Sequence, residues 1–230
     1  MFEEFRQRSH DLERLDTGDY TRKEYDRWQR EMRWIHGILG EKVALRKTLV
    51  KDIRERKLNY ASILDIGAGT GNILKLVREM LPNTDLFSIA AETSDDALRI
   101  VKKERKKTKI QPLKCSGLRL PFADHSVDFV ICTLLLHHLS DEDAVELIRE
   151  MCRVSLRRFY IVDLNRHPFG YYGFKALGSL LFQRFTREDG ALSILRSFTA
   201  DEMLAMAKKA GVSEVKVEHS RANRLVLSGR

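Results

Sequence analysis

Two acidic residues and three glycines mark the strongest candidate for a ligand site in this sequence. Asp65 ends a short apolar run, and Gly67, Gly69 and Gly71 follow it at alternate positions. Glycine permits a tight turn and lets a ligand approach the backbone closely, because it has no Cβ. The helix expected to follow offers free N–H groups at this turn. The pattern predicts a strand, a turn and a helix N-terminus that together bind a nucleotide-like ligand.

The acid before the turn indicates which ligand is compatible. A dinucleotide-binding turn follows G-x-G-x-x-G/A, and its third small residue would fall at Asn72 here. A pyrophosphate beside Asp65 would be repelled, whereas the ammonium and sulfonium groups of S-adenosylmethionine would be attracted. Glu92 closes the strand expected over 85–91, where an acid can accept hydrogen bonds from both ribose hydroxyls. We therefore expect S-adenosylmethionine rather than a dinucleotide.

These residues resemble the motifs of one enzyme family. The stretch 65–71 resembles motif I, D-x-G-x-G-x-G, of the class I S-adenosylmethionine-dependent methyltransferases, and Glu92 matches the acid of the second motif. The stretch 115–132 is similar to the pattern G-D-A-x-x-L-P-F-x-D-x-S-F-D-x-V of a branch that includes ubiquinone- and menaquinone-biosynthesis methyltransferases. The resemblance implies S-adenosyl-L-methionine as cofactor and S-adenosyl-L-homocysteine as product. It implies cofactor contacts at Asp65, Gly67, Ala68, Gly69, Gly71, Glu92, Thr93, Ser116, Gly117, Leu118 and Thr133.

Two adjacent histidines are candidates for a general base. His137 and His138 follow the fourth expected strand, at the edge of an open α/β sheet where ligands bind. An imidazole there can take a proton from an attacking hydroxyl group. Adjacent side chains cannot easily both face one site, so we prefer His138, with Asp163 at the end of the fifth expected strand as a third candidate. The alternative for either histidine is a packed, hydrogen-bonded role.

Composition limits the remaining classes of function. The 230 residues are 43% hydrophobic and 32% charged, as in a soluble globular protein. No apolar run is long enough to span a bilayer, and the start lacks the pattern of a signal peptide. The three cysteines are far apart in sequence, so we expect no disulfide and no metal, and a cytoplasmic location.

The net charge of +8 raises the question of an anionic partner. Much of the excess lies within 99–109, at the end of one expected helix. Cations stabilise that end of a helix, and in a doubly wound sheet it lies opposite the ligand-binding edge. We therefore prefer a solvated helix end to a nucleic-acid site, and we expect no nucleic-acid partner.

The helix and strand signals suggest two parts. Residues 1–58 are predicted to be helical, forming either a packed cap or a lid whose Tyr20, Tyr25 or Trp28 contacts ligand. Residues 59–230 alternate strands and helices. By resemblance they form an α/β, Rossmann-like seven-stranded sheet of order 3-2-1-4-5-7-6, with the last strand antiparallel and helices on both faces.

We make a separate prediction for each of three further segments. We predict one continuous helix over 41–56 and a polar loop over 186–193 near the mouth of the site. The aromatic-rich insertion at about 165–198 follows the fifth strand and so lies beside the transferred methyl group. It can wall an apolar substrate pocket, lie on a membrane surface, or pack against the N-terminal helices.

The leading functional hypothesis is methylation of a small, rather apolar molecule. A phenol, a quinone precursor or a polyketide- or lipid-like compound would fit, methylated on oxygen or carbon, with peripheral membrane contact as a further option. The charge motivates an RNA or protein methyltransferase as an alternative, although no N/D/S-P-P-Y/F follows the fourth strand. Ser116 stands where the family has an acid for the adenine amino group, and a hydroxyl accepts more weakly. This departure motivates a third reading, a catalytically silent cofactor-binding protein.

Overall fold

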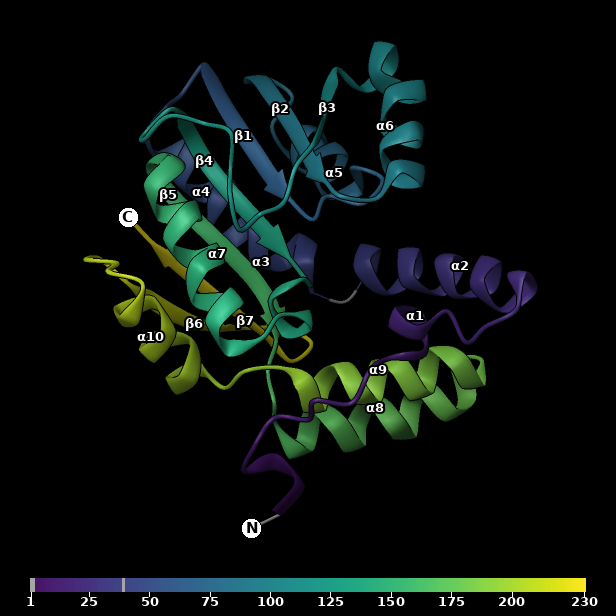
Figure 1. Cartoon of the computed structure of the whole chain (residues 1–230). Helices are drawn as coiled ribbons and strands as arrows, with labels where there is room; N and C mark the ends of the chain where they lie inside the picture. The colour runs from purple at the N-terminus through teal and green to yellow at the C-terminus, as the bar shows by residue number, and fades with distance from the viewer. Residues whose placement is uncertain (1–2, 39) are drawn as a thin grey trace.

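A seven-stranded sheet forms the centre of the protein, with the strand order β3-β2-β1-β4-β5-β7-β6 (Figure 1). The computed structural model describes the backbone of residues 3–38 and 40–230, and the side chains there except those of residues 33 and 36–38. β7 pairs antiparallel with both of its neighbours, and the other pairs are parallel. The expected Rossmann-like fold is confirmed. The strands are β1 (Tyr60–Ile66), β2 (Asp85–Glu92), β3 (Ile110–Lys114), β4 (Val127–Thr133), β5 (Ser155–Leu164), β6 (Lys216–Ser220) and β7 (Arg224–Gly229).

Helices cover both faces of this sheet (Figure 1). One apolar core joins the sheet to α7 and α10, and a second joins it to α3, α4, α5 and α6. The helices of the two layers are α3 (Glu41–Lys47), α4 (Leu49–Glu55), α5 (Asn72–Met80), α6 (Asp95–Thr108), α7 (Asp141–Val154) and α10 (Ala200–Lys209). The other helices, beyond the carboxyl ends of the parallel strands, are η1 (Glu3–Phe5), α1 (Arg14–Thr17), α2 (Arg22–Ile38), η2 (Leu136–His138), α8 (Pro168–Leu181) and α9 (Arg184–Arg196).

The first strand shows why the sheet is buried on both sides. Leu64 and Ile66 point into the core beneath α7, whereas Ile63 points into the core beneath α5. All three side chains are buried, and full burial of such a side chain contributes roughly 1.5–3 kcal/mol. A strand covered on both faces is therefore apolar at successive positions, as parallel strands generally are. This burial holds the end of β1 firmly in place beneath the glycine turn.

Capping residues begin the helices that the sequence predicts. The Ser94 hydroxyl accepts a hydrogen bond from the Ala97 N–H, and the Ser140 hydroxyl accepts one from the Asp143 N–H. Thr199 forms a complete capping box at the start of α10. These contacts fix where α6, α7 and α10 start, and they confirm the expected boundaries.

The helix expected over 41–56 is interrupted. Thr48 has φ −118° and ψ −93°, and this non-helical residue separates α3 from α4. Its N–H, at 3.1 Å, and its hydroxyl, at 2.8 Å, both donate to the Ala44 carbonyl, so that carbonyl stays paired where the chain bends. The apolar pattern continues across the break, because residues on both sides face the same core. The pattern therefore gave no sign of the interruption.

The prediction that residues 186–193 form a polar loop is wrong, because these residues lie within α9. The Asp189 carboxylate accepts hydrogen bonds from the Arg14 and Leu15 N–H groups, both at 3.0 Å. The Ser193 hydroxyl donates to Glu13 Oε1 at 2.8 Å. The polar residues of this stretch therefore form the face of a helix that binds the N-terminal segment, rather than a solvated connection.

The N-terminal segment crosses the carboxyl edge of the sheet. The Arg8 guanidinium donates to the backbone carbonyls of His137, Leu139 and Arg196. Residues that are far apart in sequence are thus joined around the loop that follows β4. Within the described ranges, no helix is both long and apolar enough to span a membrane.

Candidate functional site

The glycine turn after β1 has the geometry that its residues predict. Gly67, Gly69 and Gly71 have φ of +68°, +52° and +74°, in the left-handed region that side chains other than glycine rarely adopt. The Gly67 and Ala68 N–H groups both donate to the Ala91 carbonyl, which ties the turn to β2. A Cβ placed on Gly69 would meet no protein atom within 4 Å. The turn therefore presents bare backbone to open space, just before α5 begins.

Asp65 is a buried carboxylate beneath this turn. Among the residues that the structure describes, neither of its oxygens has a hydrogen-bond donor. Burial raises its pKa well above the usual range, and the negative charge of Glu92 raises it further. An unpaired buried carboxylate is costly, and a cationic ligand group would remove that cost. The side chain thus fits the ammonium group of S-adenosylmethionine.

Glu92 links the turn to the start of α6. One carboxylate oxygen accepts from the Gly69 N–H at 2.9 Å, and the other accepts from Thr93 and Ser94 N–H at 2.7 and 3.0 Å. The Thr93 hydroxyl also donates to that second oxygen, Oε1, at 3.3 Å, so the acceptor capacity left for a ribose hydroxyl is on Oε2, which accepts only from the Gly69 N–H among the described donors. Asp65, Glu92 and the bare turn together match the chemistry of this cofactor.

The other predicted cofactor contacts lie along the same edge. Ser116 is exposed, and its hydroxyl accepts from the Leu118 N–H at 3.2 Å. Gly117 sits against Ile66, where a Cβ would come within 2.6 Å of that side chain. Thr133 ends β4 and pairs with β5. These residues surround the carboxyl end of β1, as a bound adenosyl group would require.

His137 and Asp163 form a buried pair at the neighbouring strand ends. His137 Nδ1 lies 2.6 Å from Asp163 Oδ1, and the His137 N–H donates to the other carboxylate oxygen at 3.2 Å. Burial alone would raise the pKa of Asp163, but the charge and hydrogen bonds of His137 and the Leu164 N–H lower it overall. In the neutral imidazole, an ionised Asp163 keeps the single proton on Nδ1 and leaves Nε2 as the acceptor nitrogen.

His138 faces the same cavity as His137, contrary to the expectation that adjacent side chains would diverge. Their ring centroids are 4.2 Å apart. Both residues lie in the short helix η2. Burial, followed by the charge of His137, lowers the pKa of His138 to about 4, so its ring is neutral at neutral pH.

A cavity of about 500 Å³ opens in front of the two histidines. Leu134 and Leu164 form its floor at the ends of β4 and β5, and α8 and α9 form its walls. Most of its lining is apolar or aromatic. The lining residues are Glu13, Leu15, Trp28, Met32, Ile35, Leu134, His137, His138, Leu164, Gly170, Gly173, Phe174, Leu177, Thr186, Asp189, Gly190, Ser193, Ile194, Ala222, Asn223 and Arg224.

Of the three N-terminal aromatic residues expected near a ligand, only Trp28 lines this cavity among the described side chains. Tyr25 stacks behind Trp28 at 5.7 Å between centroids, and Tyr20 stacks on Tyr25 at 5.2 Å. Phe185 of α9 closes the stack against Tyr20 at 5.3 Å. The tyrosines therefore position the tryptophan and do not themselves reach the cavity.

Sequence reasoning missed the acidic residues that the N-terminal segment contributes. Glu13 Oε1 lies 4.0 Å from His137 Nε2, and burial raises the pKa of Glu13 to about 7. Asp16 Oδ1 lies 3.5 Å from His138 Nδ1, and Arg196 pairs with Asp16 at 2.5 Å. These contacts join segments more than a hundred residues apart. A capping acid before α1 was the only local sign of them.

Glu13, His137 and His138 also form the only grouping of possible metal ligands among the described side chains. Their ligand atoms lie within 4.8 Å of one another. The Arg196 guanidinium, however, lies 3.7 Å from Glu13 Oε1 and already supplies a positive charge there. A second cation beside it would be repelled, so the donor set fits a proton-transfer site better than a metal.

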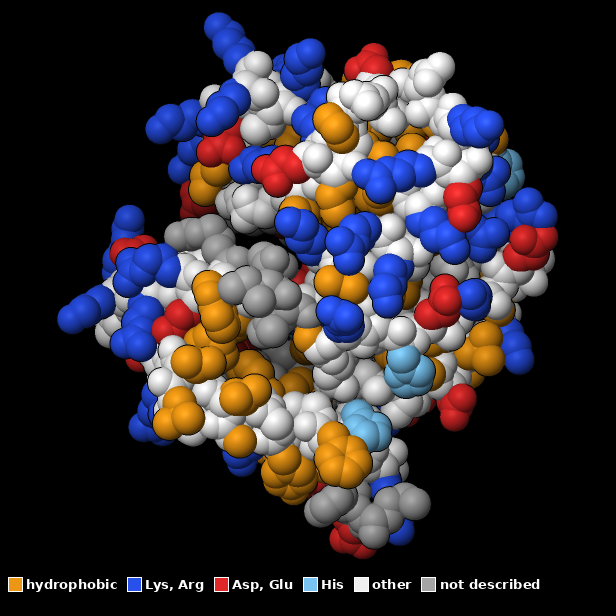
Figure 2. All heavy atoms as spheres, turned by 180° about the vertical axis from the view of Figure 1, so that it is seen from behind, with side chains coloured by type: hydrophobic (Ala, Val, Ile, Leu, Met, Phe, Trp, Pro, Cys, Tyr) orange, Lys and Arg blue, Asp and Glu red, His pale blue; other side chains and the backbone are white. Residues whose placement is uncertain are grey.

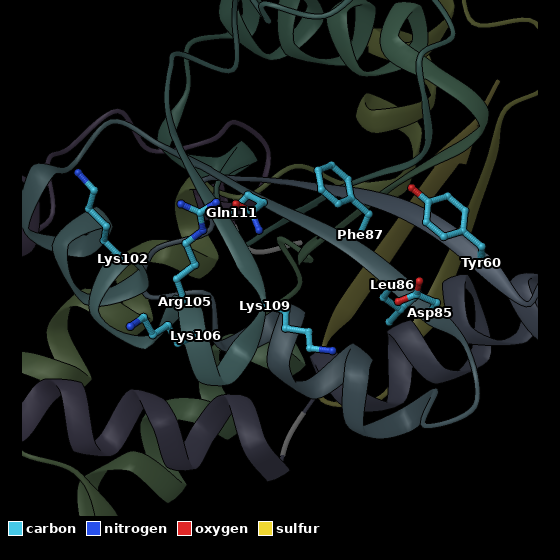
Figure 3. Close-up of a pocket in the computed structure, with 9 residues that line it drawn as sticks. All are labelled: Tyr60, Asp85, Leu86, Phe87, Lys102, Arg105, Lys106, Lys109 and Gln111. Atoms are coloured by element: carbon cyan, nitrogen blue, oxygen red, sulfur yellow. The ribbon is translucent and has the colours of Figure 1, made fainter.

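A second hollow, of about 640 Å³, lies at the opposite end of the sheet (Figure 3). Tyr60 and Phe87, from the first halves of β1 and β2, lie at one side of it, and the cations from the end of α6 lie at the other. The basic residues of this hollow are Lys102, Arg105, Lys106 and Lys109. Because it lies at the amino ends of the strands, it is remote from the glycine turn and the histidines.

A family model and several solved structures match this chain. Residues 63–157 match a family model described as a methyltransferase domain. No curated protein matches the chain in sequence.

Solved structures share the fold at low identity. The plantazolicin methyltransferase BpumL, in complex with a monoazolic desmethylPZN analog and SAH, has a TM-score of 0.70 at 16% identity, over 94% of this chain and 92% of that one. A possible histamine N-methyltransferase from Thermotoga maritima has a TM-score of 0.59 at 17% identity, over 91% and 99% of the two chains. A SAM-dependent methyltransferase from Aquifex aeolicus has a TM-score of 0.56 at 17% identity, over 78% of this chain and 87% of that one.

Proposed function

We propose that this chain is a class I S-adenosylmethionine-dependent methyltransferase and that it methylates a small, rather apolar molecule held between η2, α8 and α9. The observation that carries this proposal is the mostly apolar cavity of about 500 Å³ that opens on His137 and His138, in a segment whose Leu135 contacts Gly67 of the glycine turn. A cavity of this size and lining suits a compound such as a phenol, a quinone precursor or a polyketide-like lipid.

We infer that the cofactor lies along the carboxyl edge of β1 and β2. Asp65 would hold its ammonium group and Glu92 its ribose. When bound, the cofactor supplies a methyl carbon on a positively charged sulfur. Leu135 packs against Gly67, so the turn and the segment that bears the histidines are in direct contact.

We assign His137 the role of general base, in preference to His138. Asp163 holds the His137 ring through Nδ1, so that Nε2 is free to accept a proton. Glu13 Oε1, 4.0 Å from Nε2, is too distant for a hydrogen bond, which leaves room for an acceptor hydroxyl near both groups. His138 lacks a comparably short orienting contact, since Asp16 lies 3.5 Å away. This arrangement favours O-methylation, or C-methylation of a carbon activated by such a hydroxyl.

The surrounding chain would align the acceptor and exclude water. Methyl transfer is an in-line displacement, so its rate depends mainly on holding the nucleophile opposite the leaving sulfur. Trp28 and Phe174 wall the cavity, and Leu134 lies on its floor. These apolar surfaces would fix a planar or lipid-like acceptor in one orientation and keep bulk water away from His137.

The two alternative functions receive less support. An RNA or protein substrate would be attracted to the basic hollow around Lys106, but that hollow lies at the other end of the strands from His137 (Figure 3). A catalytically silent protein would have no need of the oriented His137–Asp163 pair. Neither alternative accounts for the apolar cavity beside the histidines.

Incubation of the purified protein with a deuteriomethyl cofactor and a metabolite extract tests this proposal. We expect a mass-labelled small product that partitions into organic solvent, and we expect His137→Gln to abolish its formation. Label found only in RNA or protein would contradict the proposal. Cofactor binding without any labelled product would favour the silent reading.

A further inference from the structure

The outer face of α8 is an unusually apolar surface. Phe169 and Leu180 are 86% and 85% exposed, and Leu177 is 64% exposed. Leu181, and Trp34 from the end of α2, extend the same surface, which we call the α8 patch. Figure 2 shows hydrophobic side chains gathered at the lower left of the molecule, where α8 lies. Soluble proteins rarely expose a contiguous group of large apolar side chains without a partner for it.

The α8 patch continues into the substrate cavity. Leu177 is both strongly exposed and part of the cavity wall, and Gly173, one turn before it, is also exposed and lines the same cavity. The helix is thus apolar on the side that faces the cavity and on the side that faces solvent. A helix with apolar residues around most of its circumference is suited to an apolar environment rather than to water. The mouth of the cavity therefore opens at the edge of an apolar surface.

The charges around the α8 patch are mainly positive. Lys175 is the only charged residue of α8. α2 lies next to the junction of α8 and α9, because Trp34 packs on Phe182 at 5.9 Å and Glu31 accepts from the Gln183 N–H. α2 exposes the cations Arg22, Lys23, Arg27 and Arg30 and the acid Asp26, and Arg27 pairs with Glu31 at 2.7 Å, so cations outnumber acids on its exposed face. Apolar side chains flanked by cations characterise helices that lie at the surface of an anionic membrane.

We propose that the α8 patch docks on an anionic lipid bilayer, so that an apolar acceptor enters the cavity directly from the membrane past Leu177. The docking surface is inferred from the exposed side chains alone, whereas the entry of the acceptor from the membrane depends on the proposed function. Docking would bury Phe169, Leu180 and Leu181 among acyl chains and place Lys175 at the level of the lipid headgroups. Such contact is peripheral and reversible.

Vesicle flotation with the full-length protein tests the docking surface. Vesicles of equal parts phosphatidylcholine and phosphatidylglycerol are compared with vesicles of phosphatidylcholine alone. We expect binding to the anionic vesicles that weakens as salt is raised. A double substitution, Phe169→Ser with Leu180→Ser, is expected to weaken binding at least about tenfold, because two large apolar side chains are removed. Lys175→Gln is expected to weaken it about fivefold.

The matched control is Leu156→Ser, which removes an apolar side chain that is 55% exposed at the start of β5, far from α8. It is expected to leave vesicle binding unchanged. Cofactor affinity, measured by calorimetry on every variant, shows whether the fold and the cofactor site are intact. Neither Phe169 nor Leu180 lines the cavity. If the protein binds the cofactor normally but does not bind vesicles, the docking inference is overturned and the methyltransferase proposal still stands.

Two results would overturn the docking surface. The first is that the protein remains unbound with both kinds of vesicle, which would show that it makes no membrane contact. Alternatively, sedimentation equilibrium could show a dimer that the Phe169→Ser and Leu180→Ser double variant converts to a monomer. The α8 patch would then be the contact between two copies of the chain.

Discussion

His137 and Asp163 are joined through two contacts at the carboxyl edge of the sheet: a 2.6 Å side-chain contact, and a 3.2 Å hydrogen bond from the His137 backbone. The pair fixes both the position and the tautomer of the imidazole before any substrate arrives. Preorganisation of this kind is what a proton acceptor near the reacting atoms requires.

Removal of this base is expected to reduce turnover without affecting cofactor binding. His137→Gln and Asp163→Asn should lower kcat by roughly 10²–10⁴-fold, the usual contribution of general base catalysis. His138→Gln should have a smaller effect, because His138 has no comparably short orienting contact. Turnover of the deuteriomethyl cofactor checks this, with the exposed His167→Gln as control. Full activity of His137→Gln would exclude His137 as the base.

Asp65 is expected to lower the stability of the free protein while raising its affinity for the cofactor. Because burial raises its pKa above the unfolded value, the ionised carboxylate costs free energy at neutral pH. Asp65→Asn should therefore raise the melting temperature of the free protein and weaken cofactor binding at least about tenfold. Calorimetry and thermal unfolding measure the two effects, and Asp85→Asn at the exposed start of β2 is the control. Unchanged cofactor affinity would remove Asp65 from the site.

Glu13 is expected to make stability fall as pH rises. Burial raises its pKa from 4.5 to about 7, so between these values the folded protein binds more protons than the unfolded chain. The contribution of Glu13 to the free energy of unfolding should decrease across this window and change no further above it. Glu13→Gln should flatten the decrease, whereas Glu79→Gln on the exposed side of α5 should not. Urea unfolding across the window measures both slopes, and identical slopes would contradict the assignment.

The Arg224–Glu41 pair is expected to hold α3 against the end of the sheet. Arg224 Nε lies 2.7 Å from Glu41 Oε1, and both side chains are buried. Glu41→Ala would leave a buried guanidinium unpaired, at a cost of about 3–5 kcal/mol in the free energy of unfolding. Glu55→Ala, which breaks an exposed pair with Lys51, should cost no more than about 1 kcal/mol. Equal losses in the two variants would show that the buried pair has no special role.

Sequence patterns alone predicted those parts of the site whose contacts join residues close together in the chain. The glycine spacing after Asp65 predicted a turn whose three positive φ values the structure contains. Ser94, Ser140 and Thr199 predicted helix starts, because a cap lies within three residues of the N–H that it binds. Strand order followed from the family resemblance rather than from the patterns themselves.

The remaining parts depend on contacts between distant segments. Nothing near Glu13 indicates that its carboxylate meets Ser193, which is 180 residues away. The polar residues around Asp189 resembled a loop because their partners, the N–H groups of Arg14 and Leu15, come from the other end of the chain. His137 and His138 both line one cavity beside Glu13 and Asp16, and these acids come from a segment more than a hundred residues away.

Crystals soaked with S-adenosylhomocysteine test the central claim most directly, namely that the carboxylates of Asp65 and Glu92 flank a turn shaped for a cationic methyl donor. We predict that the ammonium group lies within hydrogen-bond distance of Asp65 and that the ribose hydroxyls donate to Glu92. An empty turn, or a ligand bound instead in the basic hollow around Lys106, would contradict the account.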